Sequence, residues 1–325
     1  MNLQQLRFVR ETIRQNFNLT EAAKALYTSQ PGVSKAIIEL EDELGVEIFH
    51  RYGKRIRGLT EPGKRVAQVV ETIMREIDNL KQIAEELNAS ENSRLMLGTS
   101  YAEAGYFIPR ALAQFLPKHP KVEVSIRHGT LRELVEYLRS DIIEIALVME
   151  TDSTIEGMEE IAVIPLDQWE FYVVVPHNHP LKRSKHLTMK ELTRYPIITY
   201  ASLSSAQEHL QRTFGKAGVP LNIQLSAMTA DAIKAYVELG MGVGIIVSFA
   251  YDPERDKNLH GIPAKHLFGT DRAHMLLKKN TYLRNHVCAF AEQLSNALNR
   301  RMLEHILNPG SHADRAAPDA HSLSA

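Results

Sequence analysis

The chain has one cysteine and no long apolar run. A single cysteine excludes an internal disulfide framework and a cysteine-rich zinc site, and it is typical of a reducing cytosol. No stretch is apolar for long enough to span a bilayer, and residues 2–14 are amphipathic and charged, unlike a signal peptide. We therefore expect a cytoplasmic protein with no membrane partner.

Excess charge of either sign is also lacking. The formal net charge is -1, which neither predicts nor excludes a nucleic-acid partner, because the position of the charges decides this. The 325 residues are 44% hydrophobic and 24% charged. These values are typical of a soluble protein with two or three globular units.

Motifs for catalysis are missing as well. The fourteen histidines are scattered, and there is no G-x-S-x-G, H-E-x-x-H or P-loop pattern. The run Gly240-Met241-Gly242-Val243-Gly244 follows a predicted helix and opens a strand, so it is interpreted as a tight turn. Cys288 lies on the apolar side of a predicted helix over 283–298, where a buried hydrophobe is expected. We expect no enzyme, cofactor or metal.

The stretch 19–45 predicts two short helices joined by a turn. Its second helix has an apolar stripe of Val33, Ile37, Leu40 and Leu44. The turn can cap that helix with hydroxyl groups, and a proline falls in the first turn. A helical hairpin in an ordinary bundle would need the same features. In a helix-turn-helix protein, this turn and the first exposed positions of the second helix would contact DNA; they are Thr28, Ser29, Gln30, Pro31, Ser34 and Lys35.

The segment 46–63 predicts a short hairpin with an uneven charge. Its basic residues face one acid, Glu61, whereas an acidic cluster (Glu39, Glu41, Asp42, Glu43, Glu47) lies toward the far end of the preceding helix. A basic hairpin directly after a helix-turn-helix is typical of the winged variant of that motif, and such bases grip phosphates. The predicted phosphate contacts are Arg51, Lys54 and Arg55.

Residues 61–88 predict one long helix with an apolar heptad seam. The seam consists of Val66, Val70, Ile73, Ile77, Leu80, Ala84 and Leu87. Such a repeat favours a coiled coil over a helix on a globular core, so we expect at least a dimer. Each copy of the winged helix-turn-helix, called a head, would bind one DNA half-site, so a dimer would bind two half-sites.

From Arg94 onward, strands alternate with helices. The predicted strands are 95–99, 122–128, 143–148, 170–176, 197–200 and 244–247, and the helices include 108–116, 131–138, 206–217 and 230–239. This alternation predicts parallel sheets with crossover helices. Hydroxyl-rich stretches at 100–106 and 202–207 directly follow strands, where open sheets bind ligands, although plain helix capping needs the same residues.

These features together resemble the LysR-type transcriptional regulators over almost the whole chain. The similarity lies in LQQLRFV, TSQPGVSKAI, LEDELG and LTEPG. It is closest to the CysB-like sulfur-assimilation branch of that family, through LYTSQPG, YPIITY, TADAIKAYVELGMGVGII and Trp169 before FYVVVP.

The resemblance implies an α/β protein with a winged helix-turn-helix domain (1–60), a dimerising coiled-coil linker helix with a hinge (61–91) and an effector-binding domain (92–307). The tail (308–325) contains Pro, Gly, Ser, Asp and Ala, and from this composition we expect it to be disordered. The effector domain would resemble periplasmic binding proteins, with subdomain I at about 92–165 and 268–307 and subdomain II at about 166–267. The chain would cross between the subdomains near Pro165 and Phe268, and hinge motion there would close the cleft.

The resemblance also implies partners: promoter DNA bound by a homotetramer built as a dimer of dimers, RNA polymerase and a small effector. Effector positions carried over from that branch are Ser100, Ala102, Glu103, Met149, Trp169 and Ser205, beside Ser202 from the strand-end pattern. Ala102 and Met149 cannot donate to an anion, and an ionised Glu103 would repel one. We therefore expect an effector other than bare sulfate, such as an amino-acid-like or nucleotide-sulfate sulfur metabolite.

Two other classes of function compete with an activator of sulfur assimilation. The effector half would suit a solute-binding protein for anion or amino-acid transport, but the basic winged end and the missing signal peptide speak against it. An enzyme of sulfur metabolism with a regulatory head would need a nucleophile–base constellation, which the sequence does not offer.

Overall fold

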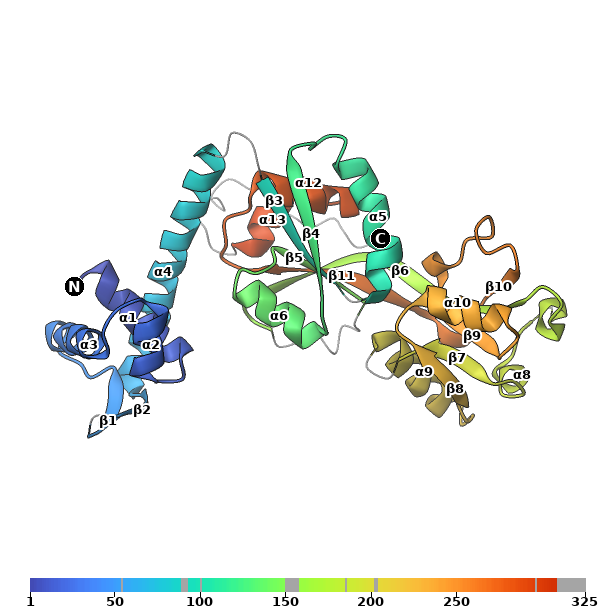
Figure 1. Cartoon of the computed structure of the whole chain (residues 1–325), viewed down its shortest axis with the longest axis horizontal. Coiled ribbons are helices and arrows are strands. Elements are labelled where there is room, and N and C mark those ends of the chain that lie inside the picture. The colour runs from blue at the N-terminus through green and yellow to red at the C-terminus, as the bar shows by residue number, and fades with distance from the viewer. Residues whose placement is uncertain are drawn as a thin grey trace, which may run out of the picture. The chain divides into compact units, whose positions relative to one another are not determined.

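A computed structural model describes residues 1–53, 55–88, 93–99, 101–149, 158–184, 186–201, 204–295 and 297–308, and within these ranges it leaves the side chains of 88 and 101–107 undescribed. The tail predicted to be disordered lies outside the described residues from 309 onward. The chain forms two compact units, 1–88 and 89–325 (Figure 1).

The first unit is a three-helix core with a hairpin and a long helix. Its elements are α1 (Leu3–Arg14), α2 (Leu19–Ala25), α3 (Gln30–Leu44), β1 (Phe49–Tyr52), β2 (Arg55–Leu59) and α4 (Glu61–Asn88) (Figure 1). Val9, Val33, Ile37 and Leu40 are fully buried, which confirms the predicted stripe of α3 for all but its last member, Leu44. Helix α3 ends at Gly45, whose φ of 68° is a left-handed conformation that glycine adopts at little cost.

Helix α4 has the predicted bounds, but its seam is used differently from the prediction. Val70 and Met74 are buried in the core of the first unit, and Val66, Ile73 and Ile77 pack against the same core. The first half of the helix therefore does lie on a globular core, which corrects the reading of the whole seam as a coiled coil. Beyond it, Leu80 and Leu87 expose 66% and 82% of their surface.

The second unit is built on a nine-stranded sheet. Its strands are β3 (Ser93–Thr99), β4 (Val122–His128), β5 (Ile145–Val148), β6 (Ile161–Pro176), β7 (Ile197–Tyr200), β8 (Ile223–Ala227), β9 (Val243–Val247), β10 (Leu259–Pro263) and β11 (Thr270–Lys278). The helices are α5 (Tyr101–Phe115), α6 (Leu131–Arg139), η1 (Pro180–Arg183), α8 (Met189–Leu192), α9 (Ser205–Lys216), α10 (Ala230–Glu238), η2 (Ser248–Ala250), α11 (Lys265–Phe268), α12 (Asn285–Leu294) and α13 (Arg300–Leu307).

The sheet is mixed, so the prediction of parallel sheets is only partly right. The strand order is β4-β3-β5-β11-β6-β9-β7-β8, with β10 also on β6. Strand β3 is parallel to β4 and β5, and β7 is parallel to β8 and β9. By contrast, β11 is antiparallel to β5 and β6, and β6 is antiparallel to β9 and β10.

Strand β6 joins the two halves of this sheet. Its first part, from Ile161 to Glu170, pairs with β11, and its second part, from Phe171 to Pro176, pairs with β9 and β10. The register of the β6–β11 ladder shifts between Arg272 and His274, close to Pro165. The chain therefore crosses between the halves on two paired antiparallel strands.

Strand β5 is a continuous apolar run because both of its faces are covered. Ile145 and Leu147 pack into the main hydrophobic cluster, whereas Ala146 and Val148 pack with the apolar face of α6 on the other side of the sheet. A strand covered on both faces has no solvent face to carry polar residues.

Three strands, β8, β10 and β11, were not predicted. Strand β8 alternates between half-buried and exposed residues, so it lacks the apolar run that marked the others. Strand β11 begins with four residues, Thr270 to Ala273, of which none is large and apolar. The predicted turn at Gly240 is confirmed, because α10 ends at Glu238, Gly240 has a φ of 74° and β9 begins at Val243.

Within the described residues, no helix is long and apolar enough to cross a membrane.

Candidate functional site

The N-terminal end of α3 is the first candidate site. Ser29 is its N-cap, and the Ser29 hydroxyl accepts a hydrogen bond from the Gly32 N–H at 3.3 Å. With Pro31 in the first turn, the buried face of the helix begins at Val33. Gln30 and Ser34 are half-buried and Lys35 is exposed, as are Thr28, Ser29 and Pro31. The predicted DNA-contacting residues thus lie together around one helix start, off the apolar stripe.

Tyr27 belongs to the same end and was missed by the sequence analysis. Its side chain is 98% exposed, and its φ of 52° places a bulky residue in the left-handed region. It neither caps a helix nor fills the core. The signal in the sequence was an aromatic residue two positions before the helix cap Ser29, which the helical pattern alone does not mark as exposed.

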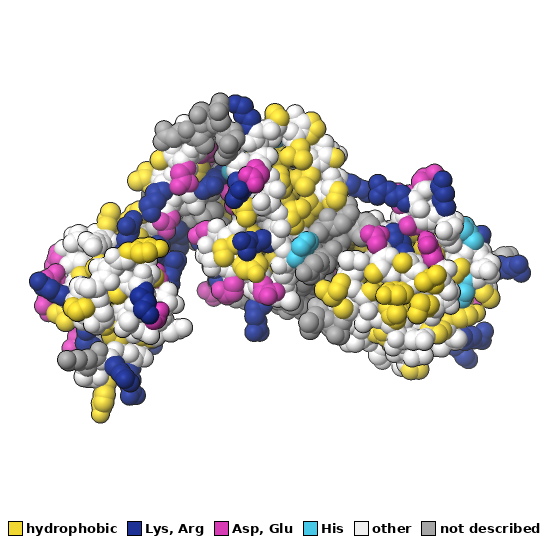
Figure 2. Space-filling model, in the orientation of Figure 1, with side chains coloured by type: hydrophobic (Ala, Val, Ile, Leu, Met, Phe, Trp, Pro, Cys, Tyr) yellow, Lys and Arg dark blue, Asp and Glu magenta, His cyan; other side chains and the backbone are white. Residues whose placement is uncertain are grey.

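The hairpin β1–β2 carries basic side chains beside this helix. Arg55 and Arg57 are exposed, and the Arg57 guanidinium lies 5.2 Å from the ring centroid of Tyr52. Lys54 lies outside the described residues. Figure 2 shows Lys and Arg side chains at the hairpin end of the unit. These cations suit a phosphate backbone.

Arg51 and Glu41 contact each other. The sequence, by contrast, predicts Arg51 as a phosphate contact and Glu41 as part of a separate acidic cluster. Glu41 is only 8% exposed, and one of its carboxylate oxygens accepts the N–H groups of Ile48 and Phe49 at 2.8 and 3.0 Å. The other carboxylate oxygen accepts a hydrogen bond from the Arg51 guanidinium at 3.0 Å. Glu41 is therefore a buried tie between α3 and the hairpin, and Arg51 is engaged in that tie. Arg51 remains a predicted DNA contact.

The second candidate site lies where strands of the large sheet end. Ser100 and Ser202 lie outside the described residues, and Ala102 and Glu103 fall in the first turns of α5, where only the backbone is described. Met149 directly follows β5 and is 3% exposed. Ser205 is the half-buried first residue of α9. The hydroxyl of its neighbour Ser204 caps α9 by accepting the Gln207 N–H at 3.2 Å, so plain capping does account for this hydroxyl.

Trp169 is 4% exposed and stands in a cluster of rings. It packs edge-on against Phe171, with centroids 5.0 Å apart, and lies 6.4 Å from the ring of His209 on α9. The His209 Nε2 lies 2.7 Å from the carbonyl oxygen of Phe268 and must donate, because a carbonyl only accepts. Its Nδ1 lies 3.2 Å from the Asp271 carboxylate. His209 thus fastens α9 to the start of β11.

Two buried polar atoms of this region have no hydrogen-bond partner among the described residues. They are the indole Nε1 of Trp169 and the side-chain Oε1 of Gln207. Gln207 is 5% exposed and was not predicted as a site residue by name, although the hydroxyl-rich stretch ended on it. A buried donor and a buried acceptor left unsatisfied cost free energy that a bound ligand can recover.

The described residues support neither metal binding nor cysteine chemistry. In the described part of the chain, no group of three or more His, Cys, Asp or Glu side chains could hold a metal ion. Cys288 is 3% exposed, as predicted, and burial raises the pKa of its thiol to about 11, with Glu292 nearby adding to the effect against the opposing charge of Arg300. Such a thiol is unreactive at neutral pH.

The sequence matches two known family patterns. Residues 3–64 match the bacterial regulatory helix-turn-helix protein, lysR family, and residues 88–299 match the LysR substrate binding domain.

Three similar proteins cover nearly the whole chain. The HTH-type transcriptional regulator CysB of Burkholderia cenocepacia is 46% identical over 307 residues, which are 94% of this chain and 97% of that protein. The regulator SsuR of the same organism is 40% identical over 94% of this chain and 99% of its own length. The regulator cbl of Escherichia coli K12 is 35% identical over 91% of this chain and 93% of its own.

Solved structures show the same architecture. The cofactor-binding domain of the Cbl transcriptional regulator is 26% identical, with a TM-score of 0.62 over 67% of this chain and 94% of that domain. Full-length CbnR, solved in complex with its target DNA, is 19% identical to this chain, with a TM-score of 0.55 over 92% of this chain and all of CbnR. At this identity, the similarity shows a shared fold only.

Proposed function

The chain belongs to the LysR family of bacterial transcriptional regulators, and from this premise we propose that it activates sulfur-assimilation genes in response to a small effector. The similarity to CysB, SsuR and cbl, which extends over nine-tenths of the chain, supports the choice of pathway. The observation that carries the DNA-binding part is the exposed start of α3, together with the basic hairpin that Glu41 ties to the same helix.

In the proposed mechanism, α3 enters the major groove and the hairpin lies on the adjacent backbone. Gln30, Ser34 and Lys35 contact base edges, and Arg55 contacts phosphate. Thr28, Ser29 and Pro31 bring the backbone of the turn close to the duplex. Tyr27 adds an exposed hydroxyl and ring at the same edge.

The active form is proposed to be a dimer of dimers. The exposed Leu80, Ala84 and Leu87 recur at coiled-coil spacing on the free half of α4, and a second copy of the helix would bury them. Promoter DNA then contacts several heads at once, and RNA polymerase is the partner that contacts the DNA-bound regulator. This activity places the protein in the cytoplasm.

The effector is proposed to bind between the two halves of the large sheet, close to Trp169 and Gln207. Among the described residues, the indole N–H of Trp169 and the amide oxygen of Gln207 have no partner. The N–H suits an oxyanion, whereas the amide oxygen needs a donor. An amino-acid-like or nucleotide-sulfate sulfur metabolite offers both, whereas bare sulfate offers only acceptors. Ser100, Ala102, Glu103, Met149, Ser202 and Ser205 complete the proposed site.

A gel shift tests the DNA-binding part. Purified protein is mixed with promoter DNA from upstream of the genes that flank its own, with random DNA of equal length as the control. We expect a shift of promoter DNA at protein concentrations that leave random DNA free. If neither DNA is bound while a small solute is, the solute-binding alternative replaces the regulator.

Calorimetric titration tests the effector. Sulfate, O-acetylserine and adenosine phosphosulfate are titrated separately into the protein. We expect one of the two donor-bearing compounds to bind more tightly than sulfate. Tight binding of sulfate alone would contradict the assignment of Gln207.

A further inference from the structure

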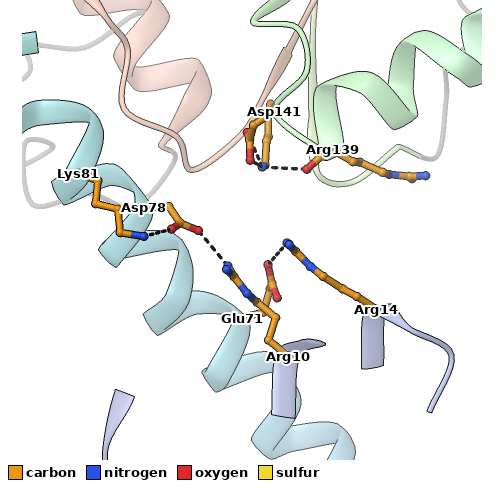
Figure 3. Close-up of polar contacts among 8 residues, drawn as sticks. Arg10, Arg14, Glu71, Asp78, Lys81, Arg139 and Asp141 are labelled. Atoms are coloured by element: carbon orange, nitrogen blue, oxygen red, sulfur yellow. Dashed lines mark hydrogen bonds and ion pairs between the residues drawn. The ribbon is translucent and has the colours of Figure 1, made fainter. Parts of the chain in front are cut away.

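Helices α1 and α4 are joined by charged contacts (Figure 3). The Arg10 Nη1 donates to the Asp78 Oδ2 at 2.9 Å, and the Lys81 Nζ lies 3.2 Å from the other oxygen of the same carboxylate. The Arg10 side chain is only 16% exposed and that of Asp78 34%. Partial burial and a shared carboxylate make this a stronger contact than an isolated surface ion pair.

A second, weaker contact shows how the helices run. Arg14 lies 3.5 Å from Glu71, with both side chains about half exposed. The later arginine on α1 thus meets the earlier carboxylate on α4, so the two helices cross in opposite directions. Met74, between the two carboxylates in sequence, is fully buried in the core of the unit.

The Arg10–Asp78 contact lies at a boundary along α4. On its N-terminal side, the seam residues from Val66 to Ile77 pack against the core of the first unit. On its C-terminal side, Leu80 is 66% exposed and Leu87 is 82% exposed. The ion pair is therefore at the place where α4 leaves the head and continues as the helix that a second copy would cover.

We propose that Arg10 and Asp78 are positioning residues that set the spacing between the two DNA half-sites. The inference rests on the proposed function, because it requires a DNA-binding dimer joined through α4. If the dimer seam is beyond Leu80, the orientation of each head relative to that seam depends on how firmly α1 is held on α4. Apolar packing allows small rotations of the head, whereas a partly buried ion pair has one favourable geometry.

This role predicts a particular pattern of binding. A head that rotates on α4 still presents an intact α3 and hairpin, so it binds a single half-site normally. The dimer, however, no longer holds its two reading helices at one separation. Loss of the ion pair should therefore weaken binding to correctly spaced sites and improve tolerance of wrongly spaced ones.

The test uses full-length protein and a DNA site that the protein itself selects from a random library. Three probes are made: the selected two-half-site DNA, one half-site alone, and the selected site with about 5 base pairs inserted, which turns one half-site to the other side of the duplex. Fluorescence anisotropy gives the Kd for each. The variants are Arg10→Gln, Asp78→Asn, the double variant, Arg10→Lys as the conservative replacement, and Arg14→Gln as the matched control from the exposed pair.

Wild-type protein should strongly prefer the selected spacing. Arg10→Gln and Asp78→Asn should each reduce that preference about fivefold while half-site affinity stays within about twofold. The double variant should be no worse than either single one, and Arg10→Lys should recover part of the preference. Arg14→Gln should behave as wild type.

Two results would overturn the proposal. An unchanged spacing preference in folded, dimeric Arg10→Gln means that packing alone positions the head. An equal loss on one half-site and on the full site means that Arg10 contacts DNA or supports the fold of the head. Failure of the wild-type protein to select any DNA would instead refute the proposed function, so the two failures are distinguishable.

Discussion

The guanidinium of Arg51 lies 3.0 Å from the buried carboxylate of Glu41, so a base of the hairpin β1–β2 is tied to an acid of α3. The same carboxylate holds the N–H groups of Ile48 and Phe49, where the chain enters the hairpin. Glu41 thus sets the position of the hairpin relative to α3.

Replacing Glu41 with alanine should destabilise the first unit by about 2 to 3 kcal/mol, because two backbone donors lose their acceptor and Arg51 loses its partner. Denaturant unfolding measures the change. Glu39→Ala is the matched control from the same helix, since Glu39 forms only a loose, exposed pair with Lys35 at 3.7 Å. Equal stability of the two variants would show that Glu41 is not a structural tie.

Ser34→Ala and Arg55→Ala should weaken DNA binding in different ways. Loss of a base contact lowers affinity for the selected site but not for random DNA. Loss of a phosphate contact lowers both, and it reduces the slope of log K against log salt by about one unit. Titrations on both DNAs at several salt concentrations measure this. An equal loss on both DNAs for Ser34→Ala would remove Ser34 from the base-reading set.

Gln207→Leu should stabilise the ligand-free protein and weaken effector binding. Leucine is apolar and of similar size, so it removes a buried acceptor that lacks a partner among the described residues. Such an unsatisfied acceptor destabilises the folded protein by about 1 to 3 kcal/mol, and the substitution relieves this penalty. Thermal unfolding measures stability, and the emission of Trp169, the only tryptophan, reports binding. Unchanged affinity for a donor-bearing effector in this variant would place the ligand elsewhere.

Asp78 should make the stability of the first unit sensitive to acid. Burial raises the pKa of Asp78, but the hydrogen bonds and charges of Arg10 and Lys81 together lower it below its usual range. A depressed folded-state pKa stabilises the protein above the pKa of the unfolded chain, and this contribution is lost as pH falls through the folded pKa. The difference in Tm between wild type and Asp78→Asn should therefore be present at pH 7 and shrink in acid. A constant difference would assign the effect to causes other than the charge.

Much of the local structure could be predicted from neighbouring residues. The periodicity of residues 61–88 predicted α4 with the observed bounds, and β4 and β7 were likewise placed correctly. These elements have a clear period of their own. Strand β8, at the sheet edge, and the polar start of β11 have none, so they were missed.

The sequence by itself determined the order of the parts and the family, because helical and strand periods and short motifs are written in consecutive residues. Only the tertiary structure decided which faces are covered. Glu41 looks like a solvated acid until the hairpin folds over it, and Val70 looks like part of a dimer seam until it is buried in the core of the first unit. Burial and pairing depend on residues far apart in the chain, and a local pattern holds no information about which of them will meet.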